Sequence, residues 1–80
     1  MKVILSKIAA KSLDKIPDKF ASSIVQHLQS LAKNPHPPGS IKLTGSNNYR
    51  FRVGVYRVIY WINSETITIL RIAHRKEVYQ

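Results

Sequence analysis

The feature that most limits the fold is a change in the spacing of apolar residues on either side of residues 34–39. Before this segment, apolar residues recur every three to four positions, as on an amphipathic helix. After residue 48, aromatic and β-branched residues alternate with polar ones, as in half-buried strands. The segment between them, Asn34-Pro35-His36-Pro37-Pro38-Gly39, has the composition of a loop. The sequence therefore predicts a helical half that packs on a sheet.

The helical half divides at Pro17-Asp18. Residues 2–5 predict a short strand, after which Ser6 can cap a first helix that continues to about Ile16. Pro17-Asp18 ends that helix and starts a second one, which continues to about Lys33. So short a connection predicts an antiparallel helix hairpin. The apolar faces expected to enter the core are Ala9, Leu13 and Ile16, then Phe20, Ile24, Leu28 and Leu31.

The second half predicts three strands joined by two tight turns. The strands are Tyr49–Val53, Tyr56–Ile62 and Ile67–Ala73. Gly54-Val55 fits a two-residue type II′ hairpin turn, and Ser64-Glu65 lies in the second turn. The expected fold class is α+β: a helix hairpin packed on a small, twisted, mainly antiparallel sheet in the order β-α-α-β-β-β. A chain of 80 residues is expected to form a single domain, residues 1–80.

The charge of the chain points to an anionic polymer as partner. Thirteen Lys and Arg stand against four acids, which gives a net charge of +9. All five arginines follow residue 49, whereas seven of the eight lysines precede it. A guanidinium group offers a planar fork of donors that matches phosphate, and an ammonium group is a hydrated point charge. We therefore expect phosphate binding in the second half of the chain.

Three arginines are expected on one face of the sheet. With Gly54-Val55 as a two-residue turn, Arg52 lies opposite Arg57, and alternation adds Arg50 to the same face. Like charges directly opposite each other destabilise a sheet. A bound phosphate would relieve that repulsion, so the arrangement favours a binding role.

The same alternation places the end of the third strand. With Asn63 opposite Thr66, His74 is expected on the arginine face, with Arg75 at the strand end and Tyr79 on the tail nearby. Arg71 is then expected on the helix-covered face, in an ion pair or a partner contact. The apolar residues expected beside the arginines are Ile59, Trp61, Leu70 and Ile72. An exposed apolar strip of this kind predicts a partner surface.

Arginines, a histidine and a tyrosine on one face are the groups needed to cleave RNA without a metal ion. The 2′-hydroxyl attacks the adjacent phosphorus, a base takes its proton, cations stabilise the added phosphorane charge, and an acid protonates the leaving 5′-oxygen. A metal site for phosphoryl transfer needs clustered carboxylates, and the chain has four acids and no cysteine. Neither a metal nor a cofactor is expected.

Two motifs carry a resemblance to a family. They are Tyr49-Arg50-Phe51-Arg52-Val53-Gly54-Val55-Tyr56-Arg57-Val58-Ile59-Tyr60 and His74-Arg75-Lys76-Glu77-Val78-Tyr79. Together with Leu43-Thr44-Gly45, the chain length, the basicity and the element order, they resemble the RelE branch of the RelE/ParE toxins of toxin–antitoxin pairs. The resemblance implies a cytoplasmic, ribosome-dependent mRNA endonuclease that cuts mRNA in the ribosomal decoding site. It also implies a cognate antitoxin as partner and contact with ribosomal RNA. No apolar run approaches the ~18 residues of a membrane span, so no membrane association is expected.

The resemblance also implies roles for single residues. By position, Arg50 and Arg52 match residues that hold and activate RNA, and Lys76 is assigned to RNA binding. Arg57 matches the arginine that stabilises the transition state, and Arg75 matches a second catalytic arginine. Tyr79 matches a tyrosine that stacks on or orients the nucleotide. Relatives with lysine in place of Arg50 or Arg52 can use it as the general base. Arginine stays protonated in proteins, so the base is expected to be His74 or Tyr79.

Two other functions fit the same resemblance. One is a ParE-like toxin that inhibits gyrase, although gyrase inhibition needs no set of arginines such as this one. The other is a catalytically degenerate relative that acts only with its antitoxin, as a repressor complex. The lysine stripe Lys7, Lys11 and Lys15 is either a solvated helix face or a further contact to ribosomal RNA.

Overall fold

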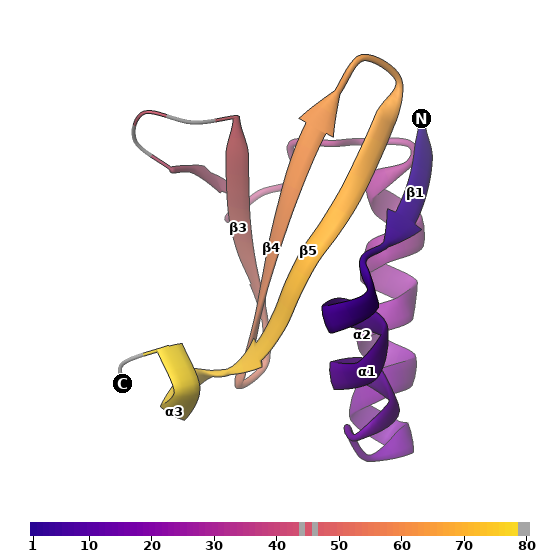
Figure 1. Ribbon diagram of the computed structural model, residues 1–80, viewed down its shortest axis with the longest axis vertical. Helices are drawn as coiled ribbons and strands as arrows, with labels where there is room; N and C mark the ends of the chain where they lie inside the picture. Colours follow the sequence, from indigo (N-terminus) through magenta and orange to yellow (C-terminus); the bar gives the residue numbers. More distant parts are fainter. Residues whose placement is uncertain (44, 46, 79–80) are drawn as a thin grey trace.

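The chain forms a sheet with two helices packed on one side (Figure 1), as seen in a computed structural model. The structure describes residues 1–43, 45 and 47–78, without the side chains of residues 77 and 78. Thr44 of the Leu43-Thr44-Gly45 segment and Tyr79 of the second motif lie outside the described residues. The elements are β1 (Lys2–Leu5), α1 (Lys7–Asp14), α2 (Asp18–Leu31), β2 (Ile41–Lys42), β3 (Asn48–Val53), β4 (Tyr56–Asn63), β5 (Thr66–His74) and α3 (Arg75–Val78).

The sheet has the order β1-β5-β4-β3-β2, in which β1 runs parallel to β5 and the other neighbours are antiparallel. The predicted fold class and element order are confirmed. Two short elements were not predicted: β2, which pairs with β3, and α3, which forms in the segment read as a tail. In the part of the chain that the structure describes, no helix has the length and hydropathy of a membrane span.

Ser6 joins the start of α1 to the sheet. Its hydroxyl accepts a hydrogen bond from the Ala9 N–H at 3.0 Å, which is the predicted N-cap. The same hydroxyl donates to the Leu70 carbonyl at 2.9 Å, and the Ser6 N–H donates to the Ile69 carbonyl at 2.9 Å. A residue that caps a helix therefore also fixes that helix against β5.

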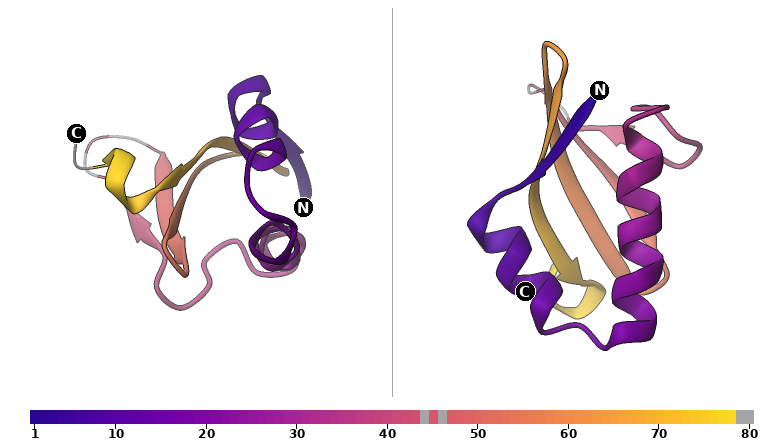
Figure 2. Two further views of the ribbon diagram at one scale, coloured as in Figure 1. Left: turned by 90° about the horizontal axis from the view of Figure 1, so that it is seen from below. Right: turned by 90° about the vertical axis from the view of Figure 1, so that its right-hand side faces the viewer.

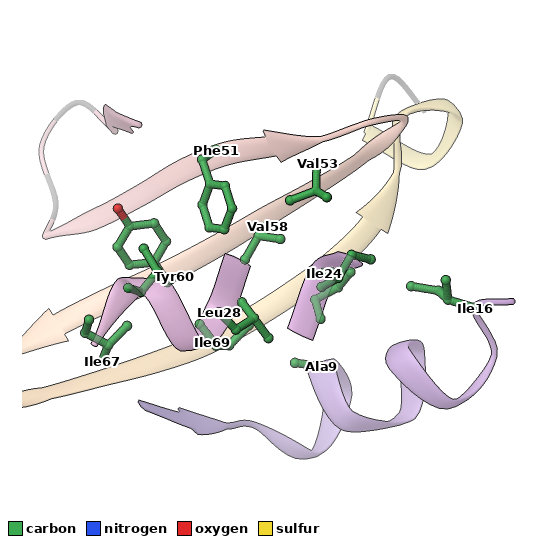
Figure 3. Close-up of a cluster of buried hydrophobic side chains, with 12 residues drawn as sticks. Ala9, Ile16, Ile24, Leu28, Phe51, Val53, Val58, Tyr60, Ile67 and Ile69 are labelled. Carbon is green, nitrogen blue, oxygen red and sulfur yellow. The ribbon is translucent and has the colours of Figure 1, made fainter. Parts of the chain in front are cut away.

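The core lies between the helices and one face of the sheet, and the opposite face is not covered by α1 or α2 (Figure 2). The buried cluster is Ala9, Ile16, Ile24, Leu28, Leu31, Phe51, Val53, Val58, Tyr60, Ile67, Ile69 and Ile72 (Figure 3). The predicted helix faces supply five of these twelve residues, β3, β4 and β5 supply the other seven, and Leu13 packs against the cluster partly buried. Phe20 is the exception, because it is 42% exposed and its ring meets only the edge of the core, 6.0 Å from that of Tyr56.

Both predicted turns are present. Val53 pairs with Tyr56 across a turn whose Gly54 has a φ of +59°, a value that favours glycine. In the second turn, Asn63 pairs with Thr66, and Ser64 takes a φ of 56°. The β4–β5 ladder then shifts by one residue, because Tyr60 pairs with Ile69 but Ile59 pairs with Arg71. Leu70 is the extra residue of a β-bulge. Each β5 side chain after Leu70 therefore lies on the opposite face of the sheet from the one that strict alternation predicts.

Candidate functional site

The face of the sheet opposite the helices, called the outer face below, carries the predicted arginines. Arg52 and Arg57 are direct partners across the β3–β4 ladder, and Arg50 lies opposite Ile59. The predicted register is confirmed at each of these positions. Arg52 is exposed, whereas Arg50 and Arg57 are half-buried, so their stems are held while their charges stay near the surface.

The strands that form the outer face contribute arginines to it and no acidic residues. The sequences of β3, β4 and β5 contain no Asp and no Glu. Two arginines opposite each other in a ladder cost stability unless an anion lies between them. The fork of a guanidinium group can bind two phosphate oxygens at once. Chemically, this face can hold a phosphodiester and stabilise negative charge that develops on it.

Arg71 lies on this outer face as well, so its predicted position on the helix-covered face is wrong. The bulge at Leu70 places Arg71 opposite Ile59, and its side chain is exposed. Ile72, predicted beside the arginines, instead pairs with Val58 and is buried in the core. The sequence held a signal for the bulge: strict alternation along β5 would bury Arg71 and expose Ile72, and one inserted residue repairs both.

His74 is also on the opposite face from the one predicted. It pairs with Tyr56 in the β4–β5 ladder, and the two rings meet edge to face with centroids 5.5 Å apart. The ring lines a pocket of about 270 Å³ on the helix side, together with Ser12 and Lys15. The physical reason is again the bulge, which moves the end of β5 by one residue relative to the arginines.

One ring nitrogen of His74 has a backbone partner. Nδ1 accepts a hydrogen bond from the Lys76 N–H at 3.1 Å, so His74 caps the first turn of α3. A ring nitrogen that accepts a hydrogen bond carries no proton, which leaves the proton of the neutral imidazole on Nε2. This hydrogen bond makes His74 the N-terminal cap that positions α3.

The short helix α3, which begins at Arg75, lies next to the β3–β4 turn (Figure 1). The Arg75 N–H donates to the Val55 carbonyl at 2.7 Å, and the side chains of Arg75 and Lys76 are exposed. This turn separates Arg52 from Arg57, so Arg75 starts at the same end of the sheet as that pair. Tyr79 follows α3 in the sequence and lies outside the described residues.

Aromatic packing supports β3 and β4 from the covered face. The rings of Tyr49 and Tyr60 stack with centroids 5.5 Å apart, and the Tyr60 hydroxyl donates to the Pro35 carbonyl at 2.7 Å. The pKa of Tyr60 is raised, mainly because burial disfavours the charged phenolate. A hydrogen bond with Ser40 lowers the pKa in part, and Tyr49 nearby raises it. This side chain therefore ties the 34–39 loop to the strands that carry the arginines.

Among the described residues, no group of three or more His, Cys, Asp or Glu could hold a metal ion. The donors that the site does offer are guanidinium and ammonium groups, which repel a cation.

Comparison with known proteins agrees with this architecture. A family model described as the ParE toxin of the type II toxin–antitoxin system parDE matches residues 3–79. Toxin RelE3 of Methanocaldococcus jannaschii is 36% identical over 84 residues, which cover 99% of this chain and 96% of the relative.

Solved structures share the fold over most of both chains. A chain of the RelBE2 toxin–antitoxin complex from Mycobacterium tuberculosis has a TM-score of 0.81 and 28% identity, and covers 92% of this chain and 96% of its own. A chain of the archaeal RelE–RelB complex from Pyrococcus horikoshii has a TM-score of 0.80 and 29% identity, with 92% and 93% covered. Fold and site together define a small toxin of the type II toxin–antitoxin class. The chain belongs to the RelE/ParE toxin family.

Proposed function

We propose that this chain is a ribosome-dependent mRNA endonuclease of the RelE type. The observation that carries the proposal is the set of arginines on the outer face, with Arg52 directly opposite Arg57. A toxin that acts only by binding a protein has no need of like charges placed in register, which cost stability. An enzyme that must stabilise a doubly charged phosphorane does need them.

The proposed reaction is attack of an RNA 2′-oxygen on the adjacent phosphorus, with departure of the 5′-oxygen and formation of a 2′,3′-cyclic phosphate. Arg57 stabilises the charge of the phosphorane, and Arg50 and Arg52 hold the phosphodiester. Arg75 adds charge from the start of α3, and Lys76 contacts the RNA backbone. Arg71, now on the same face, extends this contact across β5.

The two candidates for proton transfer are Tyr79 and His74. The Nδ1 atom of His74 already accepts the Lys76 N–H, and its ring packs on Tyr56 on the helix side. We therefore assign proton transfer to Tyr79, and to His74 the task of positioning α3, which carries Arg75 and leads to Tyr79.

The proposed partners are mRNA in the decoding site, ribosomal RNA and a cognate antitoxin, in the cytoplasm. The similar toxins named above were solved as complexes with RelB-type antitoxins. A net charge of +9 favours an antitoxin with acidic segments. We propose that the antitoxin acts by covering the arginines or by displacing the segment that contains Tyr79.

Primer extension on a reporter mRNA, translated in a purified system, tests the proposal. We expect discrete cuts within codons that disappear with Arg57→Ala and when ribosomes are omitted. Lys19→Ala is the matched control, because Lys19 is an exposed cation on α2, away from the outer face and outside the Lys7, Lys11 and Lys15 stripe. Undisturbed translation by the wild-type protein, or equal cutting by Arg57→Ala, would refute the proposal.

A second candidate is a ParE-like inhibitor of gyrase, which is favoured by the description of the family model that matches residues 3–79. Purified gyrase and plasmid DNA separate the two functions. Accumulated double-strand breaks that are independent of Arg57 would support the ParE-like inhibition of gyrase. A protein inactive in both assays, but able to bind its antitoxin and operator DNA, would be the catalytically degenerate relative.

A further inference from the structure

Trp61 is the only tryptophan of the chain, and it lies on the outer face with the arginines. It is 36% exposed, although the other aromatic residues of β3 and β4 all point to the covered face. Within these two strands, alternation puts Arg57, Ile59 and Trp61 in one line along β4. A large indole ring in that line has no structural task in the core.

The register gives this ring a defined set of neighbours. Asn48 and Thr68 lie opposite Trp61 on the two flanking strands, and the next row holds Arg50, Ile59 and Arg71. Two residues along a strand span ~6.6 Å, and strands lie ~4.8 Å apart. The row of the sheet next to the Trp61 ring therefore has Ile59 at its centre and an arginine on either side of it, Arg50 on β3 and Arg71 on β5.

This juxtaposition matches single-stranded RNA in two respects. Arginines on β3 and β5 can hold a phosphate above Ile59, and the ring one row further on offers a flat π surface of the kind on which bases stack. We propose that Trp61 is a stacking platform for a nucleobase of the bound strand, next to the phosphate held by Arg50 and Arg71. The proposal rests on the RNA-cleaving function proposed above, and it adds a direction to it: the strand runs along β4, from Arg57 towards Trp61.

The neighbours of Trp61 favour a base over an apolar side chain of a bound protein. An apolar side chain on the ring would cover the neighbouring Thr68 and remove its hydroxyl from water. A base has hydrogen-bonding edges that can reach such a hydroxyl while its face lies on the indole. Because every base has a π face, this site should bind without strong sequence preference.

Trp61 reports on its own surroundings, because its fluorescence is the only tryptophan signal of the protein. The probe is a short single-stranded RNA with 2′-O-methyl groups, which lacks the attacking hydroxyl. We expect it to quench Trp61 fluorescence as it binds, and Trp61→Ala to weaken binding at least about fivefold in an anisotropy titration of labelled RNA. Trp61→Phe should stay within about threefold of the wild type, since a phenyl ring also stacks. Phe20→Ala, which removes a similarly exposed aromatic residue from α2, should leave the affinity unchanged.

The outcomes separate this proposal from the one on which it rests. Binding by anisotropy with unchanged Trp61 fluorescence, and equal affinity of Trp61→Ala, would overturn the stacking site while the nuclease proposal stands. Loss of antitoxin affinity in Trp61→Ala with RNA affinity intact would assign the ring to a protein interface instead. Absence of both RNA binding and mRNA cleavage in the wild-type protein would overturn both proposals.

Discussion

Replacing His74 with asparagine and with glutamine distinguishes a positioning role from a proton-transfer role. The Nδ1 atom of His74 accepts the Lys76 N–H at 3.1 Å and so caps α3. Asparagine is among the best N-cap residues, because its short side chain places an oxygen where the first turn needs an acceptor. Glutamine keeps the amide but is too long to cap well. Neither amide can take or give a proton at neutral pH.

The two roles predict effects of different size. Loss of an N-cap costs ~1 kcal/mol, which corresponds to about a fivefold change in the population of a formed α3. Loss of a general acid or base costs 10²–10⁴-fold in rate, as an order of magnitude. With His74 as a positioning residue, we expect His74→Asn to cleave within about threefold of the wild type and His74→Gln to cleave about fivefold more slowly.

The assay is single-turnover cleavage of a reporter mRNA on stalled ribosomes, with rates read by primer extension. His27→Gln is the control, because His27 is an exposed imidazole on α2 whose Nδ1 lies 2.7 Å from the Ser23 carbonyl. A loss of about 100-fold or more in both His74 variants, with unchanged melting temperatures, would refute the positioning role and restore His74 as the acid or base.

Four further changes test other parts of the structure. Arg52→Gln removes a like charge opposite Arg57, so we expect the free energy of unfolding to rise by ~0.2–1 kcal/mol in urea while RNA cleavage falls; a loss of stability would contradict the repulsion argument. Arg71→Gln should lower the slope of log Kd against log salt by ~0.7 for single-stranded RNA, and an unchanged slope would remove Arg71 from the interface. Ser6→Ala removes a helix cap and a bond to the bulge carbonyl, which should cost ~2 kcal/mol and lower the melting temperature by ~8–16 °C. Burial raises the pKa of Tyr60, so the folded state holds the phenol proton more tightly, and the stability it contributes is full below pH ~10 and lost above it; Tyr60→Phe should flatten that alkaline decline in urea melts, and parallel curves would contradict it.

The fold was readable from the sequence wherever the pattern was local. The helix stripes, the Ser6 cap and the Gly54-Val55 turn each follow from a few neighbouring residues, and the turn then fixed Arg52 opposite Arg57. The short strand β2 depends on its pairing with β3, so its two residues carry no pattern of their own. The cap of α3 depends on the orientation of one imidazole, which no spacing rule reveals.

The error in the predicted site came from a single residue. Strict alternation along β5 was carried through Leu70, and each later residue was therefore assigned to the wrong face. The pattern itself argued against that reading, because it demanded a buried Arg71 and an exposed Ile72. Burial of an unpaired arginine costs more than a bulge does, and this difference decides the register.

The bulge also explains how one thin sheet can serve two purposes. Its covered face provides the stability, since Ile72 joins the core and His74 packs on Tyr56. Its outer face can then keep a row of repelling cations, because the cost of that row is offset by burial on the other side. The Ser6 hydroxyl donates to the carbonyl of Leu70, so the start of α1 holds the bulge in place. The link between α1 and β5 thus maintains both the core and the direction in which Arg71 points, although Ser6 itself lies on the helix side and far along the sequence from the arginines.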